Sequence, residues 1–257
     1  MQITFLGTGA ADWNWSIPLD DTRRGSCCTL LDGKVLIDAG ATVLQSLDRC
    51  AVAWNTVEAV VLTHSHSDHF NVQAVNAIAE APGRTQKLHF FGAPEAAALL
   101  NSSVEKHPLQ WGDRFEFNRL AFTVLPANHL INGATREESF NYLITTPEGK
   151  RLFYALDSAW ITTRARHLLG GELLDMIIWD ATSGTTFCDW RFAEHNDLKM
   201  IAYMRESMFK AKLISGSTGH VFNHIARTLW PADDAARSAA AAEYDGILAF
   251  DGMQMTL

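Results

Sequence analysis

Six consecutive residues in the first third of the chain restrict the fold more than any other segment. They are His64–His69, which read His-Ser-His-Ser-Asp-His and directly follow the apolar run Ala59–Thr63. That run has the length and composition of a buried strand. A strand that ends at such a cluster delivers several imidazoles and a carboxylate to one region, and these are ligand types for Zn²⁺, Mn²⁺ or Fe²⁺. The segment therefore predicts a metal-dependent hydrolase.

The composition is typical of a globular protein with a sizeable core, since 47% of the 257 residues are hydrophobic and 19% are charged. No linker or change of composition marks a boundary, so we expect one domain over residues 1–257. The net charge of −8 disfavours extended binding to nucleic-acid phosphates. The N-terminal residues lack a signal-peptide pattern, no stretch has the length of a membrane span, and the four cysteines show no CxxC spacing. We therefore expect a cytoplasmic protein without a membrane partner.

Short apolar runs separated by Gly, Pro and Asp predict strands and helices in succession. The pair Asp32-Gly33 predicts a hairpin turn. The predicted strands are Ile3–Leu6, Cys27–Leu31, Val35–Ile37, Val57–Thr63, Leu88–Phe91, Phe115–Phe117, Ala121–Leu125, Tyr142–Thr145, Leu152–Ala155, Met176–Trp179, Leu213–Ser215, Ile247–Phe250 and Met253–Thr256, and the predicted helices are Thr42–Cys50, Asn71–Ala81, Pro94–Leu100, Leu198–Lys210 and Ala232–Tyr244. Two sets of strands with helices on the outside predict an α/β fold, a four-layered αββα sandwich.

Three isolated ligand-type residues follow predicted strands further along the chain. His129 comes after Ala121–Leu125, Asp157 after Leu152–Ala155 and His220 after Leu213–Ser215. Ligands at the ends of separate strands can converge on one rim of a sheet. Taken alone, His129 or His220 could equally be structural, and His224 could approach the same site.

The order HxHxDH, His, Asp, His resembles the metallo-β-lactamase fold superfamily, and so does the segment Leu36-Ile37-Asp38-Ala39-Gly40. The resemblance implies two divalent transition metals, Zn²⁺ or Mn²⁺ with Fe²⁺ also compatible, which can share a hydroxide. It implies that Asp38 orients a ligand rather than binding metal. The implied metal ligands are His64, His66 and His129 for the first ion, Asp68, His69 and His220 for the second, and Asp157 bridging both.

Among the branches of this superfamily, the chain looks most like the phosphodiesterases, which include the phosphoribosyl cyclic phosphodiesterase and the transfer-RNA 3′-processing endonucleases. These enzymes carry a carboxylate-and-His pair between the bridging Asp and the last metal His. Here Asp180 and His195 match that pair, with Glu194 as an alternative carboxylate. The pair would protonate the leaving alkoxide, His195 as the acid and Asp180 as its partner. Asp68 is also expected to be catalytic. The alternative to an acid–carboxylate pair is that Glu194 and His195 belong to the N-terminal cap region of a helix.

Two departures from that branch favour a small substrate over RNA. The stretch Asp12–Ser16 lacks the cysteines of the structural zinc site in the cyclic phosphodiesterase, and no long RNA-gripping arm is present. We expect a small-molecule substrate and no nucleic acid, and a homodimer is compatible with the sequence. The alternatives are a carboxylic-ester or lactone hydrolase on the same metals, in which His195 is dispensable, and a non-catalytic metal-binding sensor. The roles of four further residues are left open, namely Trp13, Trp15, Arg23 and Arg24.

Overall fold

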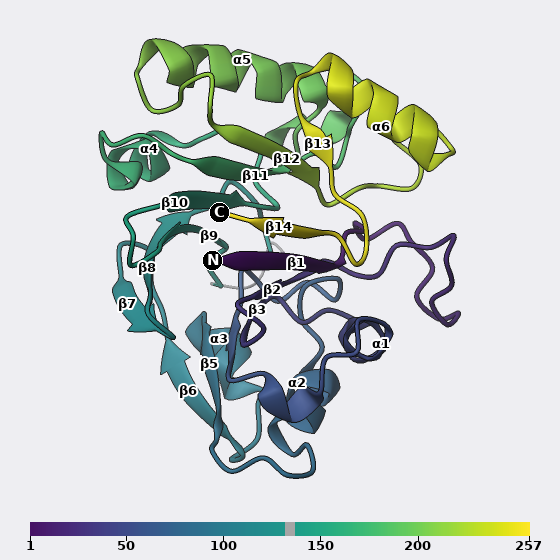
Figure 1. Cartoon of the computed structure of the whole chain (residues 1–257), viewed down its shortest axis with the longest axis vertical. Coiled ribbons are helices and arrows are strands. Elements are labelled where there is room, and N and C mark those ends of the chain that lie inside the picture. The colour runs from purple at the N-terminus through teal and green to yellow at the C-terminus, as the bar shows by residue number, and fades with distance from the viewer. Residues whose placement is uncertain (132–136) are drawn as a thin grey trace. The chain divides into compact units, whose positions relative to one another are not determined.

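The computed structural model describes residues 1–131 and 137–257, and the chain divides into two compact units (Figure 1). Unit 1 comprises Met1–Gln110, Ile131–Glu138 and Phe250–Thr256, and unit 2 comprises Trp111–Leu130, Ser139–Ala249 and Leu257. Each unit is built on one β-sheet. The expectation of a single domain stays a prediction. Among the described residues, no helix combines the length and the apolar character that crossing a membrane requires.

The sheet of unit 1 has the strand order β14-β1-β2-β3-β4-β5-β6. Its strands are β1 (Gln2–Gly7), β2 (Cys28–Leu31), β3 (Val35–Ile37), β4 (Ala59–Val61), β5 (Leu88–Gly92), β6 (Val104–Pro108) and β14 (Gln254–Thr256), and its helical segments are α1 (Val43–Arg49), η1 (Trp54–Thr56), α2 (Val72–Ala79) and α3 (Pro94–Ala98). The expected turn at Asp32 and Gly33 is confirmed, since both have positive φ and connect the antiparallel strands β2 and β3. The helices cover the sheet through one apolar core, in which Val60 and Phe90 share a cluster with Val75.

Strands β3 to β6 of unit 1 run parallel to one another. Their carboxyl ends therefore meet at the same edge of the sheet. Ile37 at the end of β3 pairs with Val61 at the end of β4. Asp38 and the segment His64–His69 consequently leave the sheet at neighbouring points.

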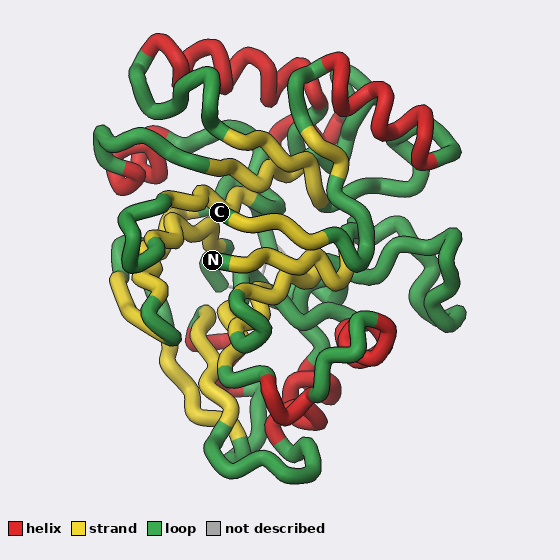
Figure 2. Tube along the Cα trace, viewed as in Figure 1, coloured by secondary structure: helices red, strands yellow, loops and turns green. Residues whose placement is uncertain are grey.

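The sheet of unit 2 has the strand order β13-β12-β11-β10-β9-β8-β7. Its strands are β7 (Arg114–Phe117), β8 (Leu120–Pro126), β9 (Phe140–Thr145), β10 (Arg151–Ala155), β11 (Met176–Asp180), β12 (Gly219–Asn223) and β13 (Ile247–Leu248), and its helical segments are α4 (Thr163–Leu169), η2 (Trp190–Ala193), α5 (Leu198–Lys210) and α6 (Asp234–Glu243). Helices α5 and α6 lie beside β12 and β13 (Figure 2). The predicted helix Leu198–Lys210 is confirmed residue for residue, with Asp197 as its N-cap and Met204 and Met208 buried in the core.

Strands β10, β11 and β12 are parallel. Ala155 pairs with Trp179, and Asp180 pairs with Asn223, so these three strands end at one edge of the sheet. Asp157, Asp180 and His224 lie at or just beyond those ends.

Several elements differ from the expectation. Leu213–Ser215 is not a strand, because the backbone N–H of Ser215 donates to Thr218 Oγ1 in a turn, and the strand β12 starts only at Gly219. Strand β6 and helix α4 were not expected. The sequence of β6, Val-Glu-Lys-His-Pro, is polar because it is the edge strand of its sheet and three of its five side chains are exposed.

Candidate metal centre

In unit 1, a buried carboxylate behind the histidine cluster holds one ring in place. Asp38 Oδ2 lies 2.8 Å from His69 Nδ1, and both side chains are fully buried. Asp38 also accepts hydrogen bonds from the backbone N–H and the hydroxyl of Thr63. The other ring nitrogen of His69, Nε2, then lies 3.5 Å from Asp68 Oδ2. A ring with one nitrogen on a carboxylate and the other free to meet a metal is the usual arrangement of a ligating histidine.

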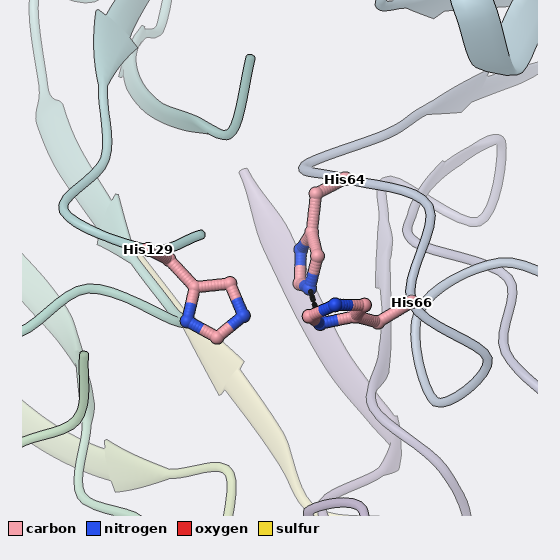
Figure 3. Close-up of side chains that lie close together, drawn as sticks. All are labelled: His64, His66 and His129. Carbon is pink, nitrogen blue, oxygen red and sulfur yellow. Dashed lines mark hydrogen bonds between the residues drawn. The ribbon is translucent and has the colours of Figure 1, made fainter. Parts of the chain in front are cut away.

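The first two histidines of the cluster converge as well. His64 Nε2 lies 3.0 Å from His66 Nδ1, and His64 Nδ1 lies 3.1 Å from Thr63 Oγ1 (Figure 3). The loop is tightened by the backbone N–H groups of His69 and Phe70, which both donate to the carbonyl of His66. Figure 3 also draws His129, which belongs to unit 2.

The segment after β3 supports this loop through its backbone. Ala39 N–H donates to the carbonyl of His69 at 2.7 Å, and its own carbonyl accepts from Asn71 N–H at 2.8 Å. A Cβ at Gly40 would lie 1.9 Å from the carbonyl oxygen of Asp68, so only glycine allows this approach. The segment Leu36–Gly40 therefore contributes in two ways. Its Asp38 orients His69, and its Gly40 allows the backbone of the His64–His69 loop to approach closely.

In unit 2, four ligand-type side chains gather at the ends of the parallel strands. Asp157, Asp180, His195 and His224 each offer one ligand atom, and these atoms all lie within 4.8 Å of one another. His224 Nε2 lies 3.2 Å from Asp157 Oδ1. His224 Nδ1 lies 2.7 Å from Thr182 Oγ1. His224 therefore has the same arrangement as His69, with one ring nitrogen supported by a polar group and the other facing a carboxylate.

The predicted pair Asp180 and His195 is brought together by the structure. Asp180 Oδ2 lies 2.8 Å from His195 Nδ1, with the carboxylate fully buried and the ring 14% exposed. Asp180 also accepts from the backbone N–H of Ser158 and from the N–H and hydroxyl of Thr182. Burial is the largest single influence and raises the pKa of Asp180, but the charge and hydrogen bond of His195, together with the nearby His224, act in the opposite direction, and the pKa of this carboxyl is lowered overall. Asp180 is thus an ionised partner for His195.

Glu194, the alternative partner, lies elsewhere. Its Oε2 is 3.2 Å from His129 Nδ1, while His129 Nε2 lies 3.7 Å from Asp157 Oδ2. His129 is therefore a third imidazole with a carboxylate near each ring nitrogen, Glu194 near Nδ1 and Asp157 near Nε2.

The structure places His220 inside a strand rather than just after one. His220 is the second residue of β12 and pairs with Ile177 near the start of β11, and its Nδ1 accepts a hydrogen bond from Trp179 Nε1 at 3.2 Å. His224 follows the last residue of the same strand. Because a strand rises about 3.3 Å per residue, four residues separate the two histidines by about 13 Å. The shift follows from the start of β12, which lies at Gly219 rather than at Leu213.

Three of these residues also have an unusual backbone conformation, which they share with turn residues elsewhere in the described chain. Asp38, Asp157 and His224 have φ values of 64°, 44° and 60°, in the left-handed region that non-glycine residues rarely adopt. Each of them follows a strand end, and strained residues of this kind cluster at functional sites. A sequence shows no φ angle, so the sequence offered His224 only as a residue that could approach the site, and the true start of β12 favours it over His220.

The donor sets of both units fit divalent transition metals. They consist of imidazole nitrogens and carboxylate oxygens, mostly buried, which is the ligand chemistry of Zn²⁺, Mn²⁺ and Fe²⁺. The Nδ1 atoms of His69 and His224 lie against Asp38 and Thr182, respectively. Their Nε2 atoms therefore face the carboxylates of Asp68 and Asp157.

A family model described as "Beta-lactamase superfamily domain" matches residues 34–206. The chain belongs to this superfamily. The matched range contains His64–His69, Asp157 and the Asp180–His195 pair, but ends before β12. The Ribonuclease Z of Myxococcus xanthus is 28% identical over 144 residues, which cover 51% of this chain and 45% of that relative. The matched part thus spans less than half the length of the relative.

Solved structures confirm the fold. The metallo-β-lactamase fold protein YhfI from Bacillus subtilis superimposes with a TM-score of 0.74 at 17% identity, covering 99% of this chain and 98% of the other. A diphosphatase of the PhnP family gives a TM-score of 0.72 at 21% identity, covering 99% and 96%. The predicted α/β metallo-β-lactamase fold is therefore confirmed. The relatives and neighbours include proteins named as a ribonuclease and a diphosphatase, which agrees with the predicted class of metal-dependent hydrolase.

The residues near the first strand have structural contacts. Arg24 is buried and its Nη1 donates to Thr8 Oγ1 at 2.7 Å, while the Trp15 indole N–H donates to the carbonyl of Arg24. Arg23 donates to the carbonyl of Pro18. These contacts support a packing role for Arg24, and they leave a substrate role for the others untested.

Proposed function

We propose that the protein is a dinuclear metal-dependent phosphodiesterase that cleaves a small or cyclic phosphodiester. Its ions are Zn²⁺ or Mn²⁺, with Fe²⁺ also compatible. Its proposed ligands are His64, His66, Asp68 and His69 from unit 1 and His129, Asp157 and His224 from unit 2. The observation that carries the proposal is the 2.8 Å contact between Asp180 Oδ2 and His195 Nδ1, in the same cluster as Asp157 and His224.

The phosphodiester reaction explains why such a pair is present. When bound, two divalent ions neutralise the charge of a phosphodiester and activate water. The departing alkoxide still requires a proton. His195 is suited to donate it, because Asp180 holds Nδ1 and stabilises the protonated ring, which leaves Nε2 as the donor atom. Asp180 is a positioning residue in this proposal, since it acts through His195.

A change of leaving group tests His195 as the acid. His195→Gln should lower kcat by about 10²–10⁴-fold on a diester with an alkyl leaving group, which needs a proton. The same variant should lower kcat much less on a p-nitrophenyl diester, whose leaving group departs as an anion. His167→Gln is the matched control, because it makes the same change at an exposed histidine of α4 that is outside the proposed site. An equal loss on both substrates, or no loss on either, would contradict the role of His195.

A small substrate is proposed from the net charge of −8, which opposes extended contact with RNA. The names of similar proteins include both a ribonuclease and a diphosphatase. A panel of cyclic phosphodiesters, lactones and a transfer-RNA precursor separates the classes. We expect kcat/KM to be highest for a cyclic or small diester. Preference for the RNA would overturn the small-substrate proposal, and turnover of lactones alone would replace it by a carboxylic-ester hydrolase.

A further inference from the structure

A second group of ligand-type side chains lies in unit 1, on the last two strands of its sheet. His89 of β5 lies beside Glu105 and His107 of the edge strand β6. His89 Nδ1 is 2.9 Å from His107 Nε2. Glu105 Oε1 is 4.0 Å from the same atom of His89 and 3.9 Å from the same atom of His107. None of these residues belongs to the proposed hydrolase ligands.

The pairing of the two strands produces this group. In the parallel register, His89 is the partner of Glu105 and Phe91 is the partner of His107. Alternate residues of a strand face the same side, so the four side chains share one face of the sheet. The ring of Phe91 stacks on His107, with centroids 4.4 Å apart and an interplanar angle of 14°. Lys106 lies between the two ligands in sequence, and its ammonium is directed to the carbonyl of Leu100.

We propose that His89, Glu105 and His107 form a separate binding site for a divalent transition metal, with Zn²⁺ as the best match. The three atoms form a triangle whose equidistant point lies about 2.1 Å from each, which is the length of Zn–N and Zn–O bonds. Two imidazoles and one carboxylate are a ligand set that Zn²⁺ uses in proteins. The ion would replace the contact between the two rings, and the fourth position would be open to water.

Such an ion could reach the site from solvent and would connect two strands of the sheet. The side chains of His89, His107 and Glu105 are 27%, 34% and 51% exposed. Within the described part of the chain, β6 is an edge strand that pairs with β5. A metal held by one residue of β5 and two of β6 therefore links the edge strand to the sheet, and metal binding to the folded chain adds to its stability.

Zn²⁺ stoichiometry of the full-length, chelator-treated protein tests this site. Isothermal titration with Zn²⁺ should show one more equivalent for the wild type than for His107→Gln. Glu105→Gln should weaken the same equivalent by at least about 10-fold, since it keeps both rings but removes the charged ligand. His167→Gln, which alters an exposed histidine of α4, is the control and should bind as the wild type does. An equal number of equivalents in wild type and His107→Gln would overturn the proposal.

The ring signals of His89 and His107 give a second readout, and they separate this site from the hydrolase ligands. In nitrogen NMR spectra, Zn²⁺ should shift His89 Nδ1 and His107 Nε2, and these shifts should persist in His224→Gln. Unchanged ring signals at saturating Zn²⁺ would overturn the site even if the phosphodiesterase proposal holds. Conversely, an inactive protein that still shows these shifts would contradict only the phosphodiesterase proposal.

Discussion

Both units place ligand-type side chains at the carboxyl ends of parallel strands, but they distribute them along the chain in opposite ways. Unit 1 concentrates four of them in the six residues His64–His69, and one strand end positions the whole set. Unit 2 takes Asp157, Asp180 and His224 from the ends of three different strands, and His195 from the segment before α5. The geometry of a contiguous motif is set by one loop, whereas the geometry of a dispersed set depends on the start and register of every strand that contributes a residue.

The comparison predicts its largest effect at Asp157, which the rings of His129 and His224 both approach. Asp157→Asn should release one of two metal equivalents and lower kcat by at least about 100-fold, because an amide is a poor ligand for these ions. Metal analysis and phosphodiester kinetics measure both. Retention of both ions would contradict a bridging role. Asp21→Asn, which makes the same change at a fully exposed side chain, is the control.

A smaller effect is expected in unit 1 at Asp38. Asp38→Asn should weaken the metal held by His69 by about 10–100-fold while the ion still binds at saturation, since Asp38 touches the ring and not the ion. Competition with a chelator of known affinity measures the change. Asp32→Asn, at the exposed hairpin turn of the same sheet, is the control. An unchanged affinity would contradict the positioning role.

The smallest effect concerns His220 and appears in stability. Burial, with a smaller contribution from Arg205, lowers the pKa of His220 from 6.5 to about 4. Between these two values the unfolded chain binds a proton that the folded chain does not. The stability contributed by the neutral ring is complete above about pH 6.5 and is lost as the pH falls toward about 4.

His220→Gln should therefore reduce the loss of unfolding free energy between pH 7 and pH 5 by about 1–2 kcal/mol relative to wild type. Urea unfolding at the two pH values measures this difference. His167→Gln should leave the pH dependence as it is, because His167 is exposed. A pH dependence that is the same with and without His220 would contradict its buried, neutral state.

Much of the fold was predictable because apolar runs and turn signals agree with it. The helix Leu198–Lys210 and the turn at Asp32-Gly33 are local features, fixed by spacing, capping and glycine. The start of β12 was not predictable. The apolar residues Leu213 and Ile214 are buried without forming a strand, so this run of buried residues resembles a strand in the sequence, and the strand end was expected too early.

The candidate site shows the same division. The pairing of His195 with Asp180 over Glu194 agrees with the sequence interpretation, because Asp180 ends a strand that hydropathy identifies. The contact of His224 with Asp157 could not be read from spacing, since it depends on where β12 ends and on the left-handed backbone of His224.

The central claim is that the last metal ligand is His224 and not His220. Metal content per chain, measured for His224→Gln and His220→Gln side by side with wild type, tests this claim most directly. We predict that His224→Gln loses about one equivalent of metal together with phosphodiesterase activity, whereas His220→Gln keeps the wild-type metal content. Loss of metal in His220→Gln with full retention in His224→Gln would contradict the account.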